Sequence, residues 1–234
     1  RITLQAGTPA LPNSFYVYIL RSWEGWRTRR PLSMKYFTAT KVIMKFKANP
    51  RVPEAEVNSQ FLDRWSPRAF ASDPLPAPLT RSLFEAAHWA PSCYNEQPWR
   101  FFYAVQPKAR KRILSVLVTG NQTWARSAPL LILLAAKKTF AETGKENRFA
   151  PFDAGAAWMS LALQARHLGI YTHAMGGFSE KKALKLLKLD PKQYTVMAAI
   201  AVGHRGEPGS LSKDWRSIET PNIRRPLASI AIEL

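Results

Sequence analysis

The sequence predicts a globular domain built from both α-helices and β-strands. Of its 234 residues, 46% are hydrophobic and 12% aromatic, which is enough to bury a sizeable core. Stretches with helical spacing of apolar residues are interspersed along the chain with short, almost continuous apolar stretches of strand length. The apolar stretch 129–136 is far too short to cross a membrane. One cysteine excludes an internal disulfide and fits a reducing compartment, so we expect a soluble, cytoplasmic protein.

Residues 1–56 differ from the rest of the chain in charge. Up to Arg51 there are ten basic residues and one acidic residue, so this stretch carries half of the net charge of +18. It shows no sustained helical or strand spacing. We expect residues 1–56 to form a basic, poorly structured N-terminal extension and residues 57–234 to form the folded domain. A transit peptide is the alternative, because the stretch is rich in arginine and poor in acids.

The first half of the folded domain is expected to contain three helices and one strand. Val57, Phe61 and Trp65 recur at helical spacing, which predicts a short helix over 57–64. A proline-rich linker precedes a second helix over 79–90, and the apolar residues 101–105 predict a strand. A third helix is expected over 108–118, with residues 120–124 interrupting it.

The second half is expected to contain two core strands and the longest helix. Apolar residues predict a central strand over 128–136 and a final strand over 195–203. Between them we expect a polar loop over 137–151, a helix over 153–168 capped by Asp153, and a helix over 180–187. The helix over 153–168 is rich in alanine and nearly free of charge, which indicates burial on most sides.

The segment between the second helix and the first strand carries several groups that could bind a ligand. Pro91 and Pro98 remove two backbone donors and stiffen the chain. Ser92, Asn95 and Gln97 offer hydroxyl and amide groups to the edge of a polar heterocycle. An ordinary helix-to-strand connection is the alternative.

Two pairs of arginines stand far apart in the sequence. Arg64 and Arg68 form the first pair, and Arg224 and Arg225 form the second. Four guanidinium groups converging on one dianion would make a phosphate site, because each can form charge-assisted bidentate hydrogen bonds. Surface arginines in solvated turns are the alternative.

Few other features of the sequence indicate a function. The adjacent Gly176 and Gly177 would let a backbone N–H approach a flat ligand, although a plain turn is the alternative. The four histidines do not show the spacing of a zinc site, and hydrolase and dinucleotide-binding motifs are absent from the sequence. We therefore expect neither a metal site nor a side-chain nucleophile.

Six motifs, in order and with suitable spacing from about Asn58 to Leu234, resemble those of the FMN-dependent nitroreductase family. They are Arg64-x-Ser66-x-Arg68, Ala90-Pro-Ser-x-x-Asn-x-Gln-Pro-Trp99, Gly120-Asn121-x-x-Trp124, Asp153-x-Gly155-x-Ala157, Met175-Gly-Gly-Phe178 and Arg224-Arg225-Pro226-Leu227.

The resemblance implies an α+β fold, with a nitroreductase-like mixed β-sheet flanked by helices, in an intertwined homodimer that binds two FMN molecules at its interface. It implies phosphate contacts from three arginines, contacts to the pyrimidine side of the ring from Ser66 and Arg68, and backbone or amide contacts elsewhere on the ring. The implied FMN-binding residues of one subunit are Arg64, Ser66, Arg68, Asn121, Gly176, Gly177, Arg224 and Arg225; those of the partner subunit are Pro91, Ser92, Cys93, Asn95 and Gln97.

The implied function is an FMN-dependent oxidoreductase that takes hydride from NAD(P)H and reduces nitroaromatic, quinone or similar acceptors by a ping-pong mechanism. The cofactor would carry the chemistry and the protein would position it. A non-catalytic flavin-binding module of the same fold is one alternative. A nucleic-acid-associated protein attracted by its charge is a second, less favoured because no nucleic-acid-binding motif accompanies the basic residues.

Three positions depart from the family pattern. Cys93 stands where serine is frequent, and its thiol is only a weak hydrogen-bond donor. Trp124 replaces a cation found in some members, which leaves Arg68 as the expected positive charge beside the reduced ring. Asn222 lies where another basic residue is often found, which predicts weaker phosphate binding.

Overall fold

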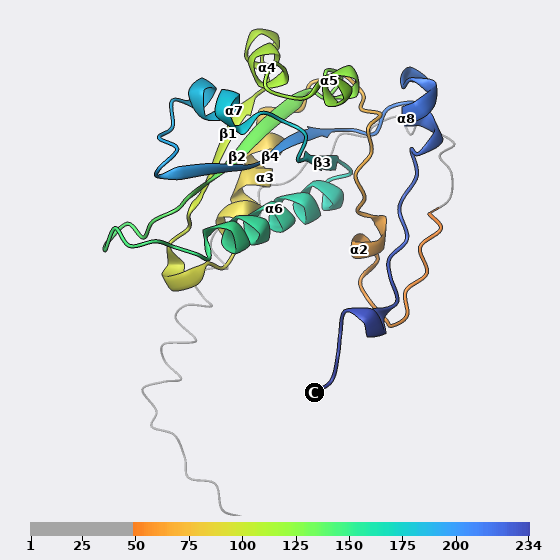
Figure 1. Cartoon of the computed structure of the whole chain (residues 1–234). Helices are drawn as coiled ribbons and strands as arrows, with labels where there is room; N and C mark the ends of the chain where they lie inside the picture. The colour runs from red at the N-terminus through yellow and green to blue at the C-terminus, as the bar shows by residue number, and fades with distance from the viewer. Residues whose placement is uncertain (1–48) are drawn as a thin grey trace, which may run out of the picture. The chain divides into compact units, whose positions relative to one another are not determined.

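The structure is a computed structural model that describes residues 49–234 (Figure 1). Residues 1–48 of the predicted N-terminal extension lie outside the described residues. Residues 49–56 are described, and they follow the C-terminal segment, since the Glu54 carboxylate accepts a hydrogen bond from the N–H of Leu227 at 2.9 Å. The extension and its boundary at residue 56 stay a prediction.

Four strands form one sheet in the order β1-β2-β4-β3 (Figure 1). Strand β1 spans Trp99–Ala104, β2 Leu130–Lys137, β3 Tyr171–Met175 and β4 Tyr194–Gly203. Neighbouring strands in this sheet are all antiparallel. The α+β fold is confirmed, but the mixed pairing expected of the sheet does not occur among the strands of residues 49–234.

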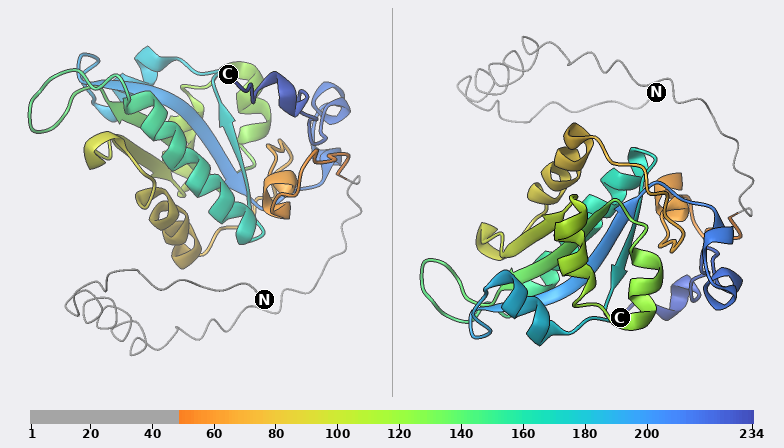
Figure 2. Two further views of the ribbon diagram at one scale, coloured as in Figure 1. Left: turned by 90° about the horizontal axis from the view of Figure 1, so that it is seen from below. Right: turned by 90° about the horizontal axis from the view of Figure 1, so that it is seen from above.

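Seven α-helices of the described chain surround the sheet (Figures 1 and 2). Helices α3 and α6 pack against each other and cover one face, whereas α4, α5 and α7 lie over the other. The α-helices are α2 Ser59–Asp63, α3 Ala77–His88, α4 Pro107–Leu114, α5 Thr119–Ala125, α6 Ala150–His167, α7 Glu180–Leu187 and α8 Lys213–Ser217; the short 3₁₀ turns are η1 Cys93–Asn95, η2 Pro208–Ser210 and η3 Leu227–Ser229.

Strand β2 supplies side chains to two cores, one on each face of the sheet. Leu131 and Leu133 belong to the core beneath α4, α5 and α7, while Leu130, Ile132 and Leu134 belong to the core beneath α3 and α6. The period of two residues along a strand produces this division. Because both faces are covered, the strand is apolar almost throughout, and the predicted central strand is confirmed.

Two predictions in the first half of the domain differ from the structure. The helix expected over 108–118 ends at Leu114, and the expected interruption at residues 120–124 is itself helical, as α5. Helix α5 forms because Trp124 and Ala125 are buried on one side of it. Tertiary packing outweighs the low helix propensity of glycine here.

The structure also corrects the prediction for the longest helix. Helix α6 begins at Ala150, so Asp153 lies in its first turn and is not its cap. Pro151 fits the start of a helix, where a missing N–H costs nothing. The helix is not buried on most sides in a single subunit, since Phe152 is 78% exposed and Gly155 is exposed. Strand β3 was not predicted at all.

We predict that Lys188→Gly stabilises the protein. Lys188 ends α7 in the left-handed conformation with φ of 56°, where a side chain is strained and glycine is not. The expected gain is about 0.5–1 kcal/mol in the free energy of unfolding, measured by urea denaturation. Lys185→Gly, inside the same helix, is the control and should cost about 1 kcal/mol; equal effects of the two changes would contradict the assignment.

Candidate functional site

A buried carboxylate holds the segment that contains Arg64, Ser66 and Arg68. Glu219 is 4% exposed, and its oxygens accept hydrogen bonds from the backbone N–H groups of Arg68 and Ala69 at 2.9–3.0 Å. These bonds join two segments that are 150 residues apart in the chain. The position of the Arg64–Arg68 segment is therefore set by the C-terminal part of the protein.

Three arginines form a cluster at this end of the molecule. Burial, and then the charge of Arg224, lowers the pKa of Arg64; burial, and then Arg224 and Arg64, lowers the pKa of Arg51. The three guanidinium groups of this arginine cluster (Arg51, Arg64 and Arg224) thus lie close enough to repel one another. Arg64 Nε is buried and has no hydrogen-bond partner. Buried, unpaired donors beside like charges are the features of an anion site.

A cavity of about 590 Å³ adjoins the arginine cluster. Arg51, Arg224 and Arg225 contribute to its wall, together with apolar side chains such as Val57 and Ile223. The structure thus brings Arg64, Arg224 and Arg225, predicted from two distant parts of the sequence, to one region. Arg225 is exposed there.

A second group of side chains lies on the other side of Arg68. The Arg68 guanidinium lies over the ring of Trp215, 4.7 Å from its centroid, and the Trp215 indole donates a hydrogen bond to Thr123 Oγ1 at 3.3 Å. Trp124 lies one position farther along α5 and contacts His173 of β3, with 4.6 Å between ring centroids. Arg68, α5 and β3 therefore meet in one place.

His173 is held as a neutral ring in this group. Its Nδ1 lies 2.9 Å from the carbonyl oxygen of Pro67, which indicates that the proton is on Nδ1. Burial lowers the pKa of His173 to about 4, the positive charge of Arg68 acts in the same direction, and hydrogen bonds to the carbonyls of Pro67 and Ser66 oppose them. At neutral pH Arg68 is consequently the cation of this group.

Asn121 and Gly177 meet beside this group. The Asn121 amide donates a hydrogen bond to the Gly177 carbonyl at 3.1 Å. A Cβ on Gly177 would lie 2.6 Å from Asn121 Nδ2, so the contact requires glycine. Gly176 differs, because a Cβ there would meet no atom within 4 Å. The open space beside Gly176 leaves room for a ligand to approach the backbone.

The loop of residues 91–97, which carries the other five predicted residues, is strained. Tyr94, Asn95 and Gln97 have φ values of 52°, 56° and 49°, which cost about 1 kcal/mol each for residues other than glycine. Ser92 Oγ accepts a hydrogen bond from the N–H of Gln97 at 3.0 Å, and the Gln97 amide donates to Asn95. Strain that is held in place in this way is characteristic of binding loops.

Two further contacts anchor the loop of residues 91–97. The N–H of Cys93 donates to the Asp153 carboxylate at 3.2 Å, and Asp153 is only 2% exposed. Pro91 is exposed where the loop begins. Asp153, which the sequence suggested as a helix cap, therefore fixes this loop instead.

In a single chain the loop of residues 91–97 and Arg68 lie at opposite ends of the sheet. Lys137, the last residue of β2, donates its N–H to Pro98, next to the loop. At the other end of the sheet, Leu130, the first residue of β2, pairs with Val202 near the end of β4. Just beyond that end of β4, Arg205 pairs with Phe70, which is close to Arg68 in the sequence. An eight-residue strand is about 26 Å long. The predicted residues thus form two separate halves of a site in one chain.

Sequence reasoning missed four residues at these places: Arg51, His173, Trp215 and Glu219. Arg51 was counted only as charge of the predicted extension, and the other three belong to no recognised motif.

Among residues 49–234, no three His, Cys, Asp or Glu side chains are grouped so as to hold a metal ion. Within the same residues, no helix is long and apolar enough to span a membrane.

Comparison with known proteins identifies relatives over most of the chain. The model of the nitroreductase family matches residues 62–204. A Thermus thermophilus protein named NADH dehydrogenase is 28% identical over 190 residues, which cover 68% of this chain and 91% of that protein. A Streptomyces coelicolor protein whose name pairs NADH dehydrogenase with NAD(P)H nitroreductase is 24% identical over 183 residues, covering 70% and 90% of the two chains.

Solved structures show the same fold. One described as an oxidoreductase containing FMN is 39% identical with a TM-score of 0.74, and the match covers 80% of this chain and 96% of that chain. A nitroreductase family protein from Streptococcus pneumoniae TIGR4 has a TM-score of 0.62 at 20% identity, covering 75% and 98%. The second similarity concerns the fold alone.

We predict that His173 makes the stability of the protein depend on pH. Its pKa of about 4 in the folded state lies below the usual value of 6.5, so the unfolded chain takes up the proton first as pH falls. Stability should be full above about pH 6.5 and should decline toward pH 4, by up to about 1.4 kcal/mol per pH unit. In urea denaturation, the free energy of unfolding of His173→Gln should decline less as pH falls than that of the wild type. The control His88→Gln, at an exposed position, should follow the wild type. Parallel curves for His173→Gln and wild type would refute the prediction.

We predict that Gly177→Ala destabilises the protein and that Gly176→Ala does not. The new methyl group at position 177 would displace the Asn121 amide and break its hydrogen bond, which costs about 1–2 kcal/mol. At position 176 the methyl group enters open space, and the change should stay within about 0.5 kcal/mol. Thermal unfolding of the protein without added flavin measures both changes. Equal losses of stability would contradict the steric role of Gly177 beside Asn121.

Proposed function

The chain belongs to the nitroreductase family, and on that premise we propose that it is an FMN-dependent oxidoreductase, which takes hydride from NAD(P)H and reduces nitroaromatic, quinone or similar acceptors. The relative with 39% identity, described as containing FMN, supports the cofactor. The observation that carries the proposal is the arginine cluster, in which the partly buried Arg64, with its unpaired Nε and the like charge of Arg224 nearby, favours an anion.

The arginine cluster fits the phosphate of FMN. Arg64 and Arg224 would bind its oxygens, with Arg225 adding charge from the wall of the adjacent cavity. A phosphate carries close to two negative charges at neutral pH and would offset both the burial and the repulsion by Arg224 that lower the pKa of Arg64. Asn222 adds no positive charge, but the arginine cluster still contains three guanidinium groups because Arg51 contributes one.

The residues around Arg68 fit the ring. Ser66 and Arg68 would contact its pyrimidine side, Asn121 its edge, and the Gly176–Gly177 backbone would approach it where Gly176 borders open space. When bound, FMN supplies the ability to accept and pass on a hydride. The chain holds Arg68 as a fixed cation on Trp215 and keeps His173 neutral, which favours negative charge at this side of the ring.

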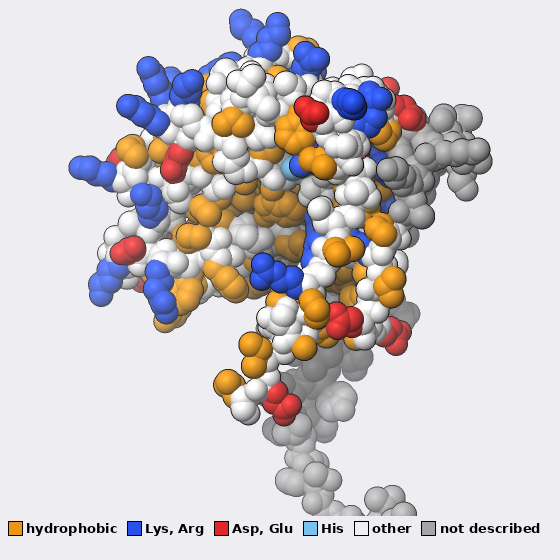
Figure 3. All heavy atoms as spheres, turned by 45° about the vertical axis from the view of Figure 1, so that its right-hand side comes forward, with side chains coloured by type: hydrophobic (Ala, Val, Ile, Leu, Met, Phe, Trp, Pro, Cys, Tyr) orange, Lys and Arg blue, Asp and Glu red, His pale blue; other side chains and the backbone are white. Residues whose placement is uncertain are grey.

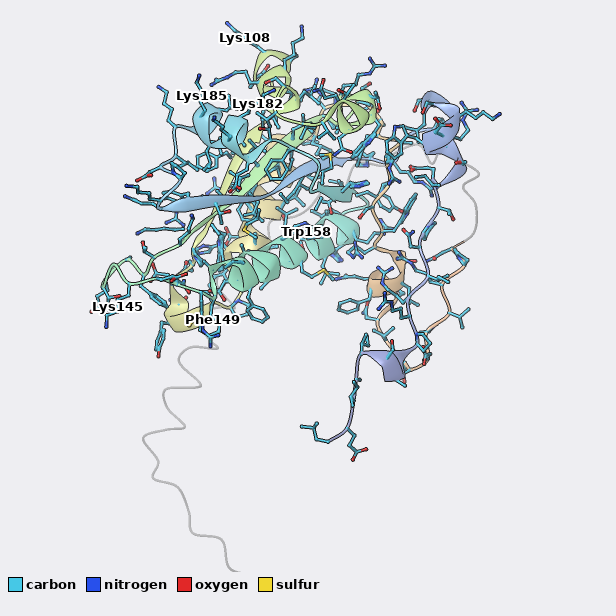
Figure 4. All side chains as sticks on the ribbon, in the orientation of Figure 1. Lys108, Lys145, Phe149, Trp158, Lys182 and Lys185 are labelled. Carbon is cyan, nitrogen blue, oxygen red and sulfur yellow. The ribbon has the colours of Figure 1, made fainter. Side chains whose placement is uncertain are left out.

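The two halves of the site come together only in a dimer. In one chain the loop of residues 91–97 and Arg68 lie at opposite ends of β2, a strand about 26 Å long, so a twofold partner must bring the loop to Arg68. Aromatic side chains suited to burial are exposed on this side: Trp89 is 77%, Tyr94 91% and Phe152 78% exposed. Figure 4 shows Phe149 at the start of α6 and Trp158 farther along it, and Figure 3 shows hydrophobic side chains gathered in the middle of one face.

The proposed dimer places NAD(P)H and the acceptor in one shared space. Pro91, Ser92, Cys93, Asn95 and Gln97 of each subunit would complete the site of the other, on a loop that holds Asn95 and Gln97 at positive φ. One open side of the ring would admit NAD(P)H and the acceptor in turn, as in a ping-pong mechanism. No side-chain nucleophile is needed.

We predict that the purified protein is yellow and that Arg64→Ala and Arg224→Ala lose the colour. Each change removes a phosphate ligand and should weaken FMN binding by about 10- to 100-fold, since a hydrogen bond to a charged group contributes about 1.5–3 kcal/mol. Absorbance near the flavin bands after gel filtration measures retained FMN. Arg112→Ala, an exposed arginine of α4, is the control and should stay yellow.

An assay of NADH oxidation with a quinone as acceptor distinguishes an oxidoreductase from a non-catalytic flavin-binding module. A yellow protein that oxidises NADH only when the quinone is present supports the oxidoreductase. A yellow protein without that activity is the non-catalytic flavin-binding module. A colourless protein that does not take up added FMN would overturn the proposal.

A further inference from the structure

The guanidinium group of Arg51 connects three segments that are distant in the sequence. Arg51 Nη1 donates hydrogen bonds to the carbonyl oxygens of Leu62 at 2.8 Å and Arg64 at 2.6 Å. Arg51 Nε donates to the carbonyl oxygen of Asn222 at 2.7 Å. The third contact spans 171 residues of the chain. Arg51 thus connects the backbone that carries Arg64 with the backbone just before Arg224.

A second contact strengthens the same connection. The Glu54 carboxylate accepts a hydrogen bond from the N–H of Leu227 at 2.9 Å, so the segment of residues 51–54 is attached to residues 222–227 at both ends. Figure 1 shows these two segments running side by side at the edge of the domain. The matched part of the family begins at residue 62, so Arg51 and Glu54 lie outside it.

The connection opposes a repulsion. Arg64 and Arg224 carry like charges that are close enough to lower the pKa of Arg64, and without a restraint the exposed Arg224 would move away. Three hydrogen bonds from Arg51 to carbonyl oxygens hold the two backbones in place before any anion arrives. A guanidinium group has five N–H donors, and three of them are used here, which leaves the Nη2 pair without a described acceptor.

We propose that Arg51 is a positioning residue for the FMN phosphate, which preorganises Arg64 and Arg224 by binding the carbonyl groups of residues 62, 64 and 222 and adds its own charge to the site. The inference rests on the proposed function and goes beyond the phosphate ligands that the family motifs contain. Preorganisation raises affinity because the restraint on the two arginine-bearing segments is already in place when the ligand binds.

Lysine could not take over this role. Its ammonium group is a compact point charge on a flexible chain, and it lacks the planar fork that reaches carbonyl groups on two separate segments. Arg51→Lys therefore keeps the charge but loses the connection, while Arg51→Met removes both and keeps the approximate length of the side chain. Comparing the two separates positioning from charge.

The experiment compares FMN with riboflavin, which has the same ring and lacks the phosphate. Dissociation constants are measured by flavin fluorescence quenching for wild type, Arg51→Met and Arg51→Lys. We expect Arg51→Met to weaken FMN binding by about 10- to 100-fold and Arg51→Lys by a smaller factor of at least about threefold, with riboflavin binding nearly unchanged in both. The preference for FMN over riboflavin should fall accordingly.

Arg110→Met is the matched control. Arg110 Nη1 also donates to a backbone carbonyl, that of Ala128, but it lies outside the arginine cluster. A loss of folding alone would weaken FMN and riboflavin binding equally and would appear in Arg110→Met as well. An unchanged FMN preference in Arg51→Met, or full wild-type affinity in Arg51→Lys, would overturn the inference while leaving the proposed function intact. Wild-type protein that binds neither flavin would instead refute the proposed function.

Discussion

Repulsion among guanidinium groups at one end of the sheet is the constraint on which the site depends. Arg51, Arg64 and Arg224 come from three distant segments, and burial together with the like charge of Arg224 makes the protonated forms of Arg51 and Arg64 less favourable than in water. Such a cluster persists only because hydrogen bonds to the backbone hold it. In the proposed function, a bound phosphate dianion would offset this repulsion, which would link the fold to the cofactor.

The antiparallel sheet has a second consequence, because it separates the two halves of the site. Strand β2 runs from the end near Arg68 to the end near the loop of residues 91–97, and the distance is too large for one ligand to span. The strained loop and the exposed Phe152 on α6 are unfavourable in an isolated chain. In the proposed homodimer both become part of a shared site, so the same features account for assembly and for binding.

The electrostatics around Arg68 are set by burial more than by composition. His173 could have carried a charge near neutral pH, but burial, which includes its contact with Trp124, lowers its pKa to about 4 and keeps the ring neutral. Arg68 remains as the cation, fixed on Trp215 and, through its backbone, on Glu219. The net charge of +18 is therefore a poor guide to this site, where one positioned cation matters more than the total.

The sequence by itself determined the elements with a clear period and the residue types of the motifs. Apolar runs predicted β2 and β4, and the helix expected over 180–187 is α7 at its observed bounds. It did not determine α5 or the true start of α6, because tertiary packing outweighs local propensity there. Only the tertiary structure brought Arg51 and Glu219 to the segments that carry Arg64, Arg68 and Arg224, since each contacts backbone groups more than 150 positions away, which leaves no local pattern in the sequence.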